Sequence, residues 1–429
     1  MATTYFRYSR VPTVCTAQAG FVANRLAGAG LHTLPGGRVV VPLLHPQAHG
    51  LPFLLTLELH PAVPGGTAPA APPPPPLQLD RSLYTLHYVL GGAGELVRGS
   101  GGGGEPLQAG DAVLTHFGGA ACRAAPPGAA AAEEAGAANL LAGSPWQLAE
   151  LVAYLPRQLF EAEQQAAAAQ QQLDAQRAGT QVLHAAGLQP LLLGAAGRSS
   201  GGGAAAVQPL PGEFVDALLA GARDTARKAL LLHDEEHGGV AAGQASTGSG
   251  PAAGGGSPAA GGLLQRAARA AASSLAAWWE AQQQRACPVA KRTLAELTAF
   301  RLPNQSNRLA VQFDPFSLPQ VPFISGIEVF ERGHRTTPHV HPRAHELFFI
   351  LAGEGVGFCG DQRFPVRAGD VVVFRPGSVH GIDNGDGSRM YCLEAMFPNE
   401  SFAEMVRSGE DTGGLTGEDL CQVAHIGCR

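Results

Sequence analysis

Four side chains in the last third of the chain could bind one metal ion: His339, His341, Glu346 and His380. His339 and His341 are two residues apart, and on a β-strand this step places both imidazoles on one face, about 7 Å apart along the chain. Proline disfavours a continued central strand, so Pro342 predicts a turn or bulge that lets Glu346 face the same way. His380 follows a Pro-Gly turn and would approach from a distant strand.

Three imidazoles and one carboxylate suit a borderline divalent transition metal. We expect Fe(II) or Mn(II), with Ni(II), Co(II) or Zn(II) as alternatives. Four protein ligands in octahedral geometry leave two positions open, which is typical of a catalytic rather than a structural site. His345 is an alternative ligand in place of Glu346, but its parity along the strand predicts that it faces outward.

The surrounding glycines complete a pattern that resembles the two motifs of the cupin superfamily. The matching residues are Gly333, His339, His341, Glu346 and Gly353 in the first motif, and Gly369, Gly377, His380 and Asn384 in the second. One departure is that the proline of the second motif is displaced by one position, to Pro376. The resemblance implies an RmlC-like jelly-roll barrel with the metal inside, and positive φ angles at the turn residues Gly353 and Gly369.

The first part of the chain resembles a second cupin. TLHYVLGGAG at 85–94 lines up with ELFFILAGEG at 346–355, and AGDAVL at 109–114 lines up with AGDVVV at 368–373. The resemblance therefore implies a bicupin.

The metal ligands are not kept in this first cupin. The residues at the four ligand positions are Gln78, Asp80, Thr85 and Ala121. We expect a degenerate barrel without this metal site, which scaffolds or covers the other barrel. His87 and His116 lie near the position by alignment, but isolated histidines are more often core or surface residues.

The local composition and apolar patterns of the chain predict a mainly β fold class with a helical insert. Residues 1–125 carry short β-type runs separated by glycine turns, as a barrel would. Residues 126–300 are rich in Ala, Gln and Gly. They predict a partly helical, partly disordered linker that includes one long helix over 145–177. Residues 301–429 return to short strands and end in two helices with capping boxes at Ser401 and Thr416. The expected architecture is two jelly-roll barrels joined by this linker.

Composition narrows the partners and the compartment. A formal net charge of -6 argues against a nucleic-acid binder. Seven scattered cysteines without a C-x-x-C pair fit a reducing compartment. No apolar run reaches the roughly 18 residues that a membrane span needs. We therefore expect a cytoplasmic protein without nucleic-acid or membrane partners. The absence of acidic residues before Glu58 leaves a chloroplast or another organelle as the alternative.

Residues at the edges of the motifs are candidates for a substrate pocket. Phe348, Phe374 and Met396 could line it, although packing inside the barrel is the favoured interpretation. Arg335 and Arg375 could bind a substrate carboxylate, although solvated side chains are the favoured interpretation.

The resemblance implies a metal-dependent oxidoreductase, dioxygenase-like, that acts on a small oxygen-rich or aromatic acid. Similar bicupins include gentisate-type dioxygenases, quercetin dioxygenases and oxalate decarboxylases, and no residue here singles out one of them. The alternatives are a metal-dependent isomerase or hydrolase, and a non-catalytic cupin that binds or stores a small molecule. The same resemblance predicts a homodimer.

Overall fold

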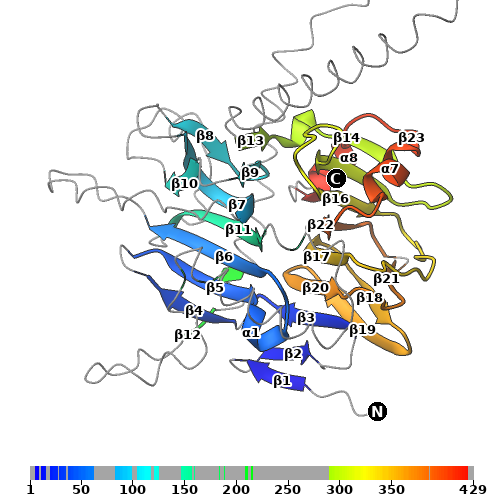
Figure 1. Cartoon of the computed structure of the whole chain (residues 1–429), viewed down its shortest axis with the longest axis horizontal. Helices are drawn as coiled ribbons and strands as arrows, with labels where there is room; N and C mark the ends of the chain where they lie inside the picture. Colours follow the sequence, from blue (N-terminus) through cyan, green and yellow to red (C-terminus); the bar gives the residue numbers. More distant parts are fainter. Residues whose placement is uncertain are drawn as a thin grey trace, which may run out of the picture.

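Two antiparallel β-barrels stand side by side in the computed structural model of the protein (Figure 1). The structure describes residues 5–8, 11–15, 20–27, 29–34, 37–61, 83–98, 104–116, 120–124, 146–156, 208–210, 214–215, 289–385 and 387–423, and the single residues 159, 183 and 188. Jelly-roll barrels were the predicted fold class, and this prediction is confirmed. None of the helices within these residues is long and apolar enough to cross a membrane.

The C-terminal barrel consists of a large sheet and a small sheet that face each other. The large sheet has the order β20-β17-β22-β16-β15-β14-β23, and the small sheet has the order β19-β18-β21. Their bounds are β14 Thr298–Arg301, β15 Arg308–Phe313, β16 Ile324–Phe330, β17 His345–Ala352, β18 Glu354–Cys359, β19 Gln362–Arg367, β20 Asp370–Phe374, β21 His380–Asn384, β22 Met390–Phe397 and β23 Glu410–Asp411.

The N-terminal barrel repeats this order. Its sheet runs β12-β4-β5-β6-β11-β7-β9, and β8 and β10 pair with the far end of β7. The bounds are β4 Gly30–Thr33, β5 Val39–Leu44, β6 Leu54–Pro61, β7 Leu83–Arg98, β8 Glu105–Gln108, β9 Ala112–His116, β10 Ala120–Ala124, β11 Trp146–Pro156 and β12 Gln208–Pro209. The two barrels share one strand topology: β4-β5-β6-β11-β7-β9 in the first corresponds to β14-β15-β16-β22-β17-β20 in the second.

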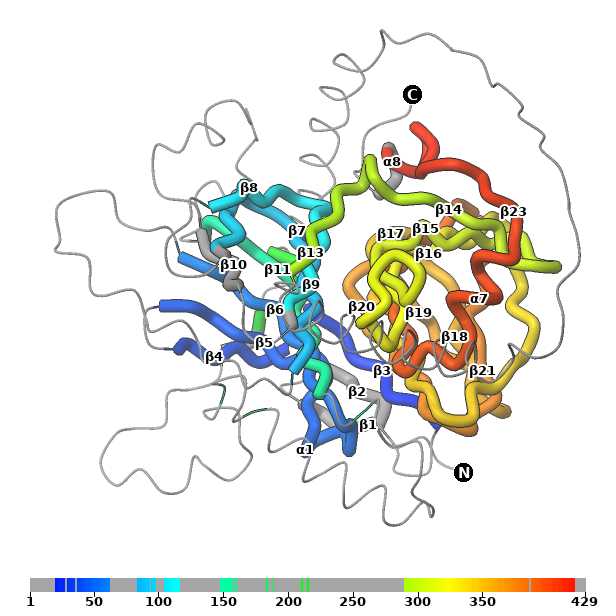
Figure 2. The backbone as a smooth tube through the Cα atoms, turned by 45° about the horizontal axis from the view of Figure 1, so that its top comes forward, coloured from blue at the N-terminus to red at the C-terminus, as the bar shows by residue number. Residues whose placement is uncertain are grey.

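The two barrels exchange strands. β3 (Phe21–Arg25) precedes the N-terminal barrel but pairs with β20 of the C-terminal one. It also pairs with β2 (Val11–Cys15), which pairs with β1 (Tyr5–Tyr8). β13 (Val289–Arg292) precedes the C-terminal barrel but pairs with β9 of the N-terminal one. Figure 2 shows the chain leaving β13 beside β9 and crossing to β14. Each barrel is thus completed by residues outside the region predicted to form it.

The prediction of a helix over 145–177 is wrong in its first part, because Trp146–Pro156 forms β11. This strand lies between β6 and β7 and pairs with both. Both of its faces are buried, so its residues form a nearly continuous apolar run that does not show the alternation of a half-exposed strand. Most of the rest of that predicted helix lies outside the described residues.

Side-chain alternation separates the barrel interiors from the interface. Leu347 and Phe349 of β17 lie in one apolar cluster with Leu55 and Leu57 of β6. Glu346 and Phe348 face the other way, into their own barrel, where Phe348 belongs to a separate cluster. The N-terminal barrel therefore packs on the outer face of the sheet that carries Glu346, and it does not cover that residue.

The chain ends in two short helices on the C-terminal barrel, α7 (Phe402–Arg407) and α8 (Gly417–Val423). The capping box predicted at Thr416 is confirmed, since Asp419 N donates to Thr416 Oγ1 and Thr416 N donates to Asp419 Oδ2. The one predicted at Ser401 is wrong, because the Asn399 side chain accepts the hydrogen bond from Ala403 N instead.

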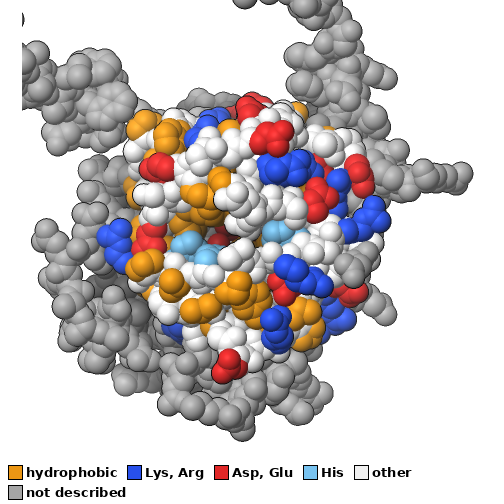
Figure 3. All heavy atoms as spheres, turned by 90° about the vertical axis from the view of Figure 1, so that its right-hand side faces the viewer, with side chains coloured by type: hydrophobic (Ala, Val, Ile, Leu, Met, Phe, Trp, Pro, Cys, Tyr) orange, Lys and Arg blue, Asp and Glu red, His pale blue; other side chains and the backbone are white. Residues whose placement is uncertain are grey.

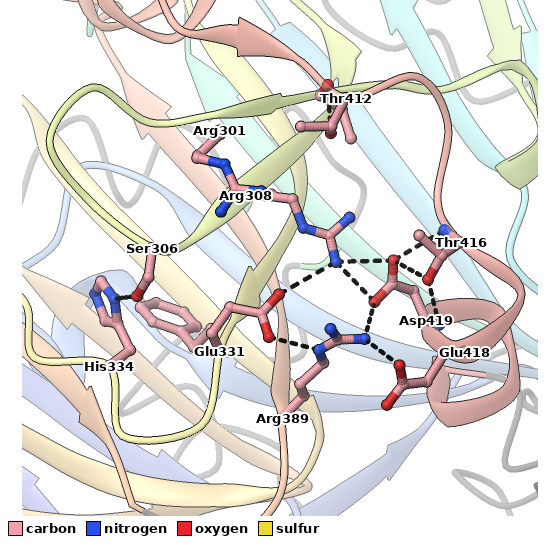
Figure 4. A network of polar contacts seen from close by, with 12 residues as sticks. Arg301, Ser306, Arg308, Glu331, His334, Arg389, Thr412, Thr416, Glu418 and Asp419 are labelled. Atoms are coloured by element: carbon pink, nitrogen blue, oxygen red, sulfur yellow. Dashed lines mark hydrogen bonds and ion pairs between the residues drawn. The ribbon is translucent and has the colours of Figure 1, made fainter.

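Ion pairs at Asp419 attach α8 to the barrel (Figure 4). Its two carboxylate oxygens accept from Arg308 Nη2 at 2.9 and 3.0 Å, and Arg389 contacts it at 3.3 Å. Arg389 also pairs with Glu331 at 2.7 Å, so one network ties the helix to β15 and to the loop after β16.

Candidate metal centre

The structure brings the four predicted ligands together at one end of the C-terminal barrel. His339, His341, Glu346 and His380 offer donor atoms that all lie within 4.8 Å of one another. Glu346 is the second residue of β17 and His380 the first of β21. His339 lies in the loop before β17 and forms an isolated antiparallel bridge with His380. The chain bends between His341 and β17, as Pro342 predicted.

Glu346 is the centre of this group. Its Oε2 lies 2.7 Å from His380 Nε2 and 3.7 Å from His339 Nε2, and its Oε1 lies 3.7 Å from His341 Nε2. Donors that bind one ion at about 2.1 Å each are about 3 Å apart from one another. The observed separations bracket this value.

Backbone carbonyls and an aromatic ring orient the imidazoles. His380 Nδ1 lies 2.7 Å from Ser378 O, and His339 Nδ1 lies 3.0 Å from Thr337 O. A ring that donates from Nδ1 presents the lone pair of Nε2 to the centre, as metal-binding histidines do. Phe374 stacks on His380 with the ring centroids 4.3 Å apart.

The chemistry of the donors fits a cation. A neutral His380 that donates from Nδ1 would turn its Nε2 lone pair toward a carboxylate oxygen, which is unfavourable unless a proton or a cation lies between them. Nε2 of His341 is buried without a hydrogen-bond partner. Burial by itself would raise the pKa of Glu346, but the nearby imidazoles of His339, His341 and His380 outweigh it and hold that pKa well below its usual range. Glu346 is therefore ionised.

The centre is closed at its base and open at its mouth. The side chains of Glu346 and His380 are 4% and 1% exposed, whereas those of His339 and His341 are 37% and 14% exposed. Figure 3 shows histidine side chains around a hollow on this face of the barrel. His339 is therefore the member of the group that solvent reaches most.

Two buried carboxyl groups near Glu346 are absent from the predicted site. Glu328 on β16 and Glu394 on β22 are 4% and 3% exposed. Burial, and then the charge of Glu346, raise the pKa of Glu328 to about 8. Burial, with the charges of Glu328 and Glu346, also raises the pKa of Glu394 well above its usual range. Both are protonated at neutral pH unless a cation lowers their pKa values. Each is a single acidic residue within a buried strand, which is the signal that could have identified it.

The predicted pocket residues have other partners. Phe348, Phe374 and Met396 are buried in apolar clusters, as the packing interpretation predicted. The two arginines were expected to be solvated, but both bind backbone carbonyl groups. Arg335 Nη1 donates to Asn384 O at 2.5 Å, and Arg375 Nη1 donates to Gly50 O at 3.0 Å. Arg375 thus connects the two barrels.

The remaining sequence predictions at this site concern His345 and the glycines. His345 faces away from the centre and packs against Phe53 and Phe397, so the alternative in which it replaces Glu346 is wrong. Positive φ angles occur at Gly353 and Gly369, as predicted, and also at Gly333 and Gly377.

Within the described residues, the corresponding position in the N-terminal barrel has no such group of donors. Thr85, aligned with Glu346, hydrogen-bonds to Thr115, and Thr115 occupies the place of Phe374 opposite it. Gln78 and Asp80 lie outside the described residues. Thr85 Oγ1 also lies 3.1 Å from His87 Nε2, so a hydroxyl pair and one imidazole occupy the place of the carboxylate.

Comparison with known proteins agrees with this division. The family model described as Cupin domain matches residues 326–396, which include all four candidate ligands. The C-terminal barrel is a cupin domain. The other barrel repeats its strand order. An uncharacterized protein from Methanocaldococcus jannaschii is 33% identical over 52 residues, 12% of this chain and 42% of that protein. The chain therefore spans less than half the length of this curated relative.

Several solved structures resemble the whole chain. Procruciferin, an 11S globulin from Brassica napus, is 14% identical with a TM-score of 0.43, covering 90% of this chain and 86% of its own. The putative glyoxylate-induced protein from Pseudomonas aeruginosa is 11% identical with a TM-score of 0.43, covering 92% and 94%. HEPD from Streptomyces albus, with 2-hydroxyethylphosphonate and Fe(II) bound, is 11% identical with a TM-score of 0.43, covering 94% and 82%. Likeness at this level concerns the fold and does not extend to a reaction.

Proposed function

We propose that this bicupin is a metal-dependent oxidoreductase that uses dioxygen on a small oxygen-rich or aromatic acid. The observation that carries the proposal is the open mouth of the metal centre. A structural metal site is closed by its protein ligands, whereas a catalytic one keeps positions free. Here the four donors converge from below and one side, and the outer two histidines are in contact with solvent.

His339, His341, Glu346 and His380 would hold the metal. A bound Fe(II) or Mn(II) ion would supply Lewis-acid and redox chemistry at the mouth of the barrel. The chain itself positions the donors: Ser378 and Thr337 hold the ring nitrogens that face away from the centre. Glu346 is the one charged side chain among the four donors, so a divalent ion bound to them keeps a net positive charge, which favours binding of a further anionic oxygen. This is why we propose an acid as the substrate.

Oxygen uptake tests this proposal. The full chain would be stripped of metal, loaded with Fe(II) without oxygen, and mixed with a panel of aromatic and keto acids in an oxygen electrode. We expect uptake with one class of acid, and none for His380→Ala treated in the same way. His32→Ala is the matched control, because His32 lies on β4 of the other barrel and is not one of the four donors.

Two other outcomes would replace the proposal. Turnover without oxygen consumption would indicate an isomerase or hydrolase. Binding of the acid without turnover would indicate a sensor or storage protein. The predicted homodimer is a separate proposal, which the mass of the protein in solution would test.

A further inference from the structure

A second group of metal-binding side chains lies inside the N-terminal barrel, on residues other than those where the cupin motif would place one. Glu58, His60 and Glu150 offer donor atoms within 4.8 Å of one another, and all three residues are buried. Glu58 and His60 come from β6 and Glu150 from β11. Glu58-Leu59-His60 is a two-residue step like His339-Val340-His341, so both side chains point into the barrel.

Register places this group at strand positions other than those of the cupin ligands. Thr85, which corresponds to Glu346, lies opposite Tyr154, four residues along β11 from Glu150. Glu58 lies directly opposite Glu150, just as Glu328 lies opposite Cys392 in the other barrel. His87 lies between the two positions, with Nε2 3.1 Å from Thr85 Oγ1 and Nδ1 2.9 Å from Glu150 Oε2. The group therefore adjoins the position of the cupin centre but is built from different strand residues.

The contacts of Glu150 repeat those of Glu346. His60 Nε2 lies 2.8 Å from Glu150 Oε1, and His87 Nδ1 lies 2.9 Å from Glu150 Oε2. In both barrels one buried carboxylate is the centre to which imidazole nitrogens converge at the separation of donors around one ion.

Two buried carboxylates face each other here, and like charges directly opposite on neighbouring strands destabilise a sheet. Arg38 Nη1 pairs with Glu58 Oε2 at 3.1 Å and offsets one charge. Tyr154 and Thr56 donate to Glu58 Oε1 at 2.5 and 3.1 Å and orient it. The two oxygens of Glu150 contact imidazoles, and Arg38 interacts with its charge from the side of Glu58. A divalent cation between Glu58, His60 and Glu150 would add to this compensation.

We infer that Glu58, His60 and Glu150 bind a second divalent transition-metal ion, while His87 orients Glu150 through its other oxygen. A mixed imidazole and carboxylate set suits Zn(II), Mn(II) or Fe(II). The inference does not depend on the proposed reaction, since this site lies in the other barrel.

Counting bound metal tests this inference. The chelator-treated full chain would be loaded with Zn(II), freed of excess metal and measured by elemental mass spectrometry. We expect two equivalents for the natural chain and one for Glu150→Gln, which keeps the shape of the side chain. His380→Gln should also keep one equivalent, and the combination of both substitutions should keep none. His32→Gln should keep two.

Folding is checked separately for each variant by circular dichroism, and a second measurement locates the ion. In His380→Gln loaded with Co(II), anomalous diffraction should show one peak between His60 and Glu150. Replacing His60 with Gln in that background should remove the peak from a folded barrel. One equivalent in the natural chain, unchanged by Glu150→Gln and lost in His380→Gln, would overturn the inference, as would a Co(II) peak elsewhere.

Discussion

The two barrels share one strand framework and differ in where they place polar groups. In the C-terminal barrel, donors gather at the mouth, where the His339–His341 loop reaches Glu346. In the N-terminal barrel the same position holds the Thr85–Thr115 pair. The buried carboxylates and the imidazole beside them lie instead on β6 and β11. The comparison teaches that the framework depends on strand pairing and turns, whereas a few interior positions decide where chemistry can occur.

The shared framework includes the junction between the barrels. In each barrel the aspartate of an Ala-Gly-Asp turn binds a basic residue of the exchanged strand. Asp370 accepts from Arg25 Nε at 2.7 Å and Nη2 at 3.0 Å, and Asp111 contacts Lys291 Nζ at 3.0 Å. Each aspartate also accepts a backbone hydrogen bond from the residue three positions before it. The repeated turn therefore attaches each exchanged strand to its host barrel.

The largest predicted difference between the barrels concerns the metal centre. Glu346→Gln removes the charge at the centre of the donors, so we expect loss of the metal of the C-terminal barrel and a fall in oxygen uptake of at least about 100-fold. The barrel should stay folded, because its core is apolar. Thr85→Val, at the matching position, should leave both quantities unchanged. An equal loss of activity in the two variants would contradict the comparison.

Glycines at the matching turns should differ in their tolerance of a side chain. Gly92 and Gly353 both have positive φ, at 85° and 83°. A Cβ on Gly92 would lie 2.0 Å from Gln147 O, whereas one on Gly353 would lie 2.8 Å from Arg389 O. We expect Gly92→Ala to cost about 3 kcal/mol of unfolding free energy and Gly353→Ala about 2 kcal/mol. Denaturant unfolding measures both, and the reverse order would show that the turns are not equivalent.

The two aspartates that bind the exchanged strands should also differ in how much they stabilise the fold. Asp370→Asn loses a two-pronged ion pair with Arg25, which we expect to cost about 2 kcal/mol. Burial raises the pKa of Asp111 to about 6, and Lys291 only partly opposes it. The ionised form is thus less favoured there, and Asp111→Asn should cost about 1 kcal/mol or less. Equal costs, measured by urea unfolding, would mean that Lys291 holds its strand as firmly as Arg25 does.

The last predicted difference is the pH dependence of stability at the interface between the barrels. Burial, with the charges of His45 and Arg375, lowers the pKa of His49 to about 3. An unfolded histidine titrates near 6.5, so between these values the unfolded chain binds more protons than the folded one. The stability from neutral His49 is complete above pH 6.5 and is lost as the pH falls toward 3, by at most about 1.4 kcal/mol per pH unit.

His49→Asn gives the comparison for this effect, because asparagine can accept the hydrogen bond that His45 N donates to His49 Nδ1. Denaturant unfolding at pH 7, 6, 5 and 4 should show a steeper loss in the natural chain than in the variant. Parallel losses would assign the acid sensitivity to other groups.

The sequence by itself determined the features that local spacing encodes. The four candidate ligands and the turn glycines follow from motif spacing, and the β character of both ends of the chain follows from short apolar runs between turns. A strand places alternate side chains on one face whatever its partners are, so such patterns can be interpreted without a fold.

Only the tertiary structure decided which strands complete which barrel and what lies inside the N-terminal one. Arg25 meets Asp370 across 345 residues, and no local pattern records that pairing. β11 has a sequence that permits a helix, but hydrogen bonds to β6 and β7 outweigh that local preference. Glu58, His60 and Glu150 become neighbours for the same reason: strand pairing joins segments that are distant along the chain.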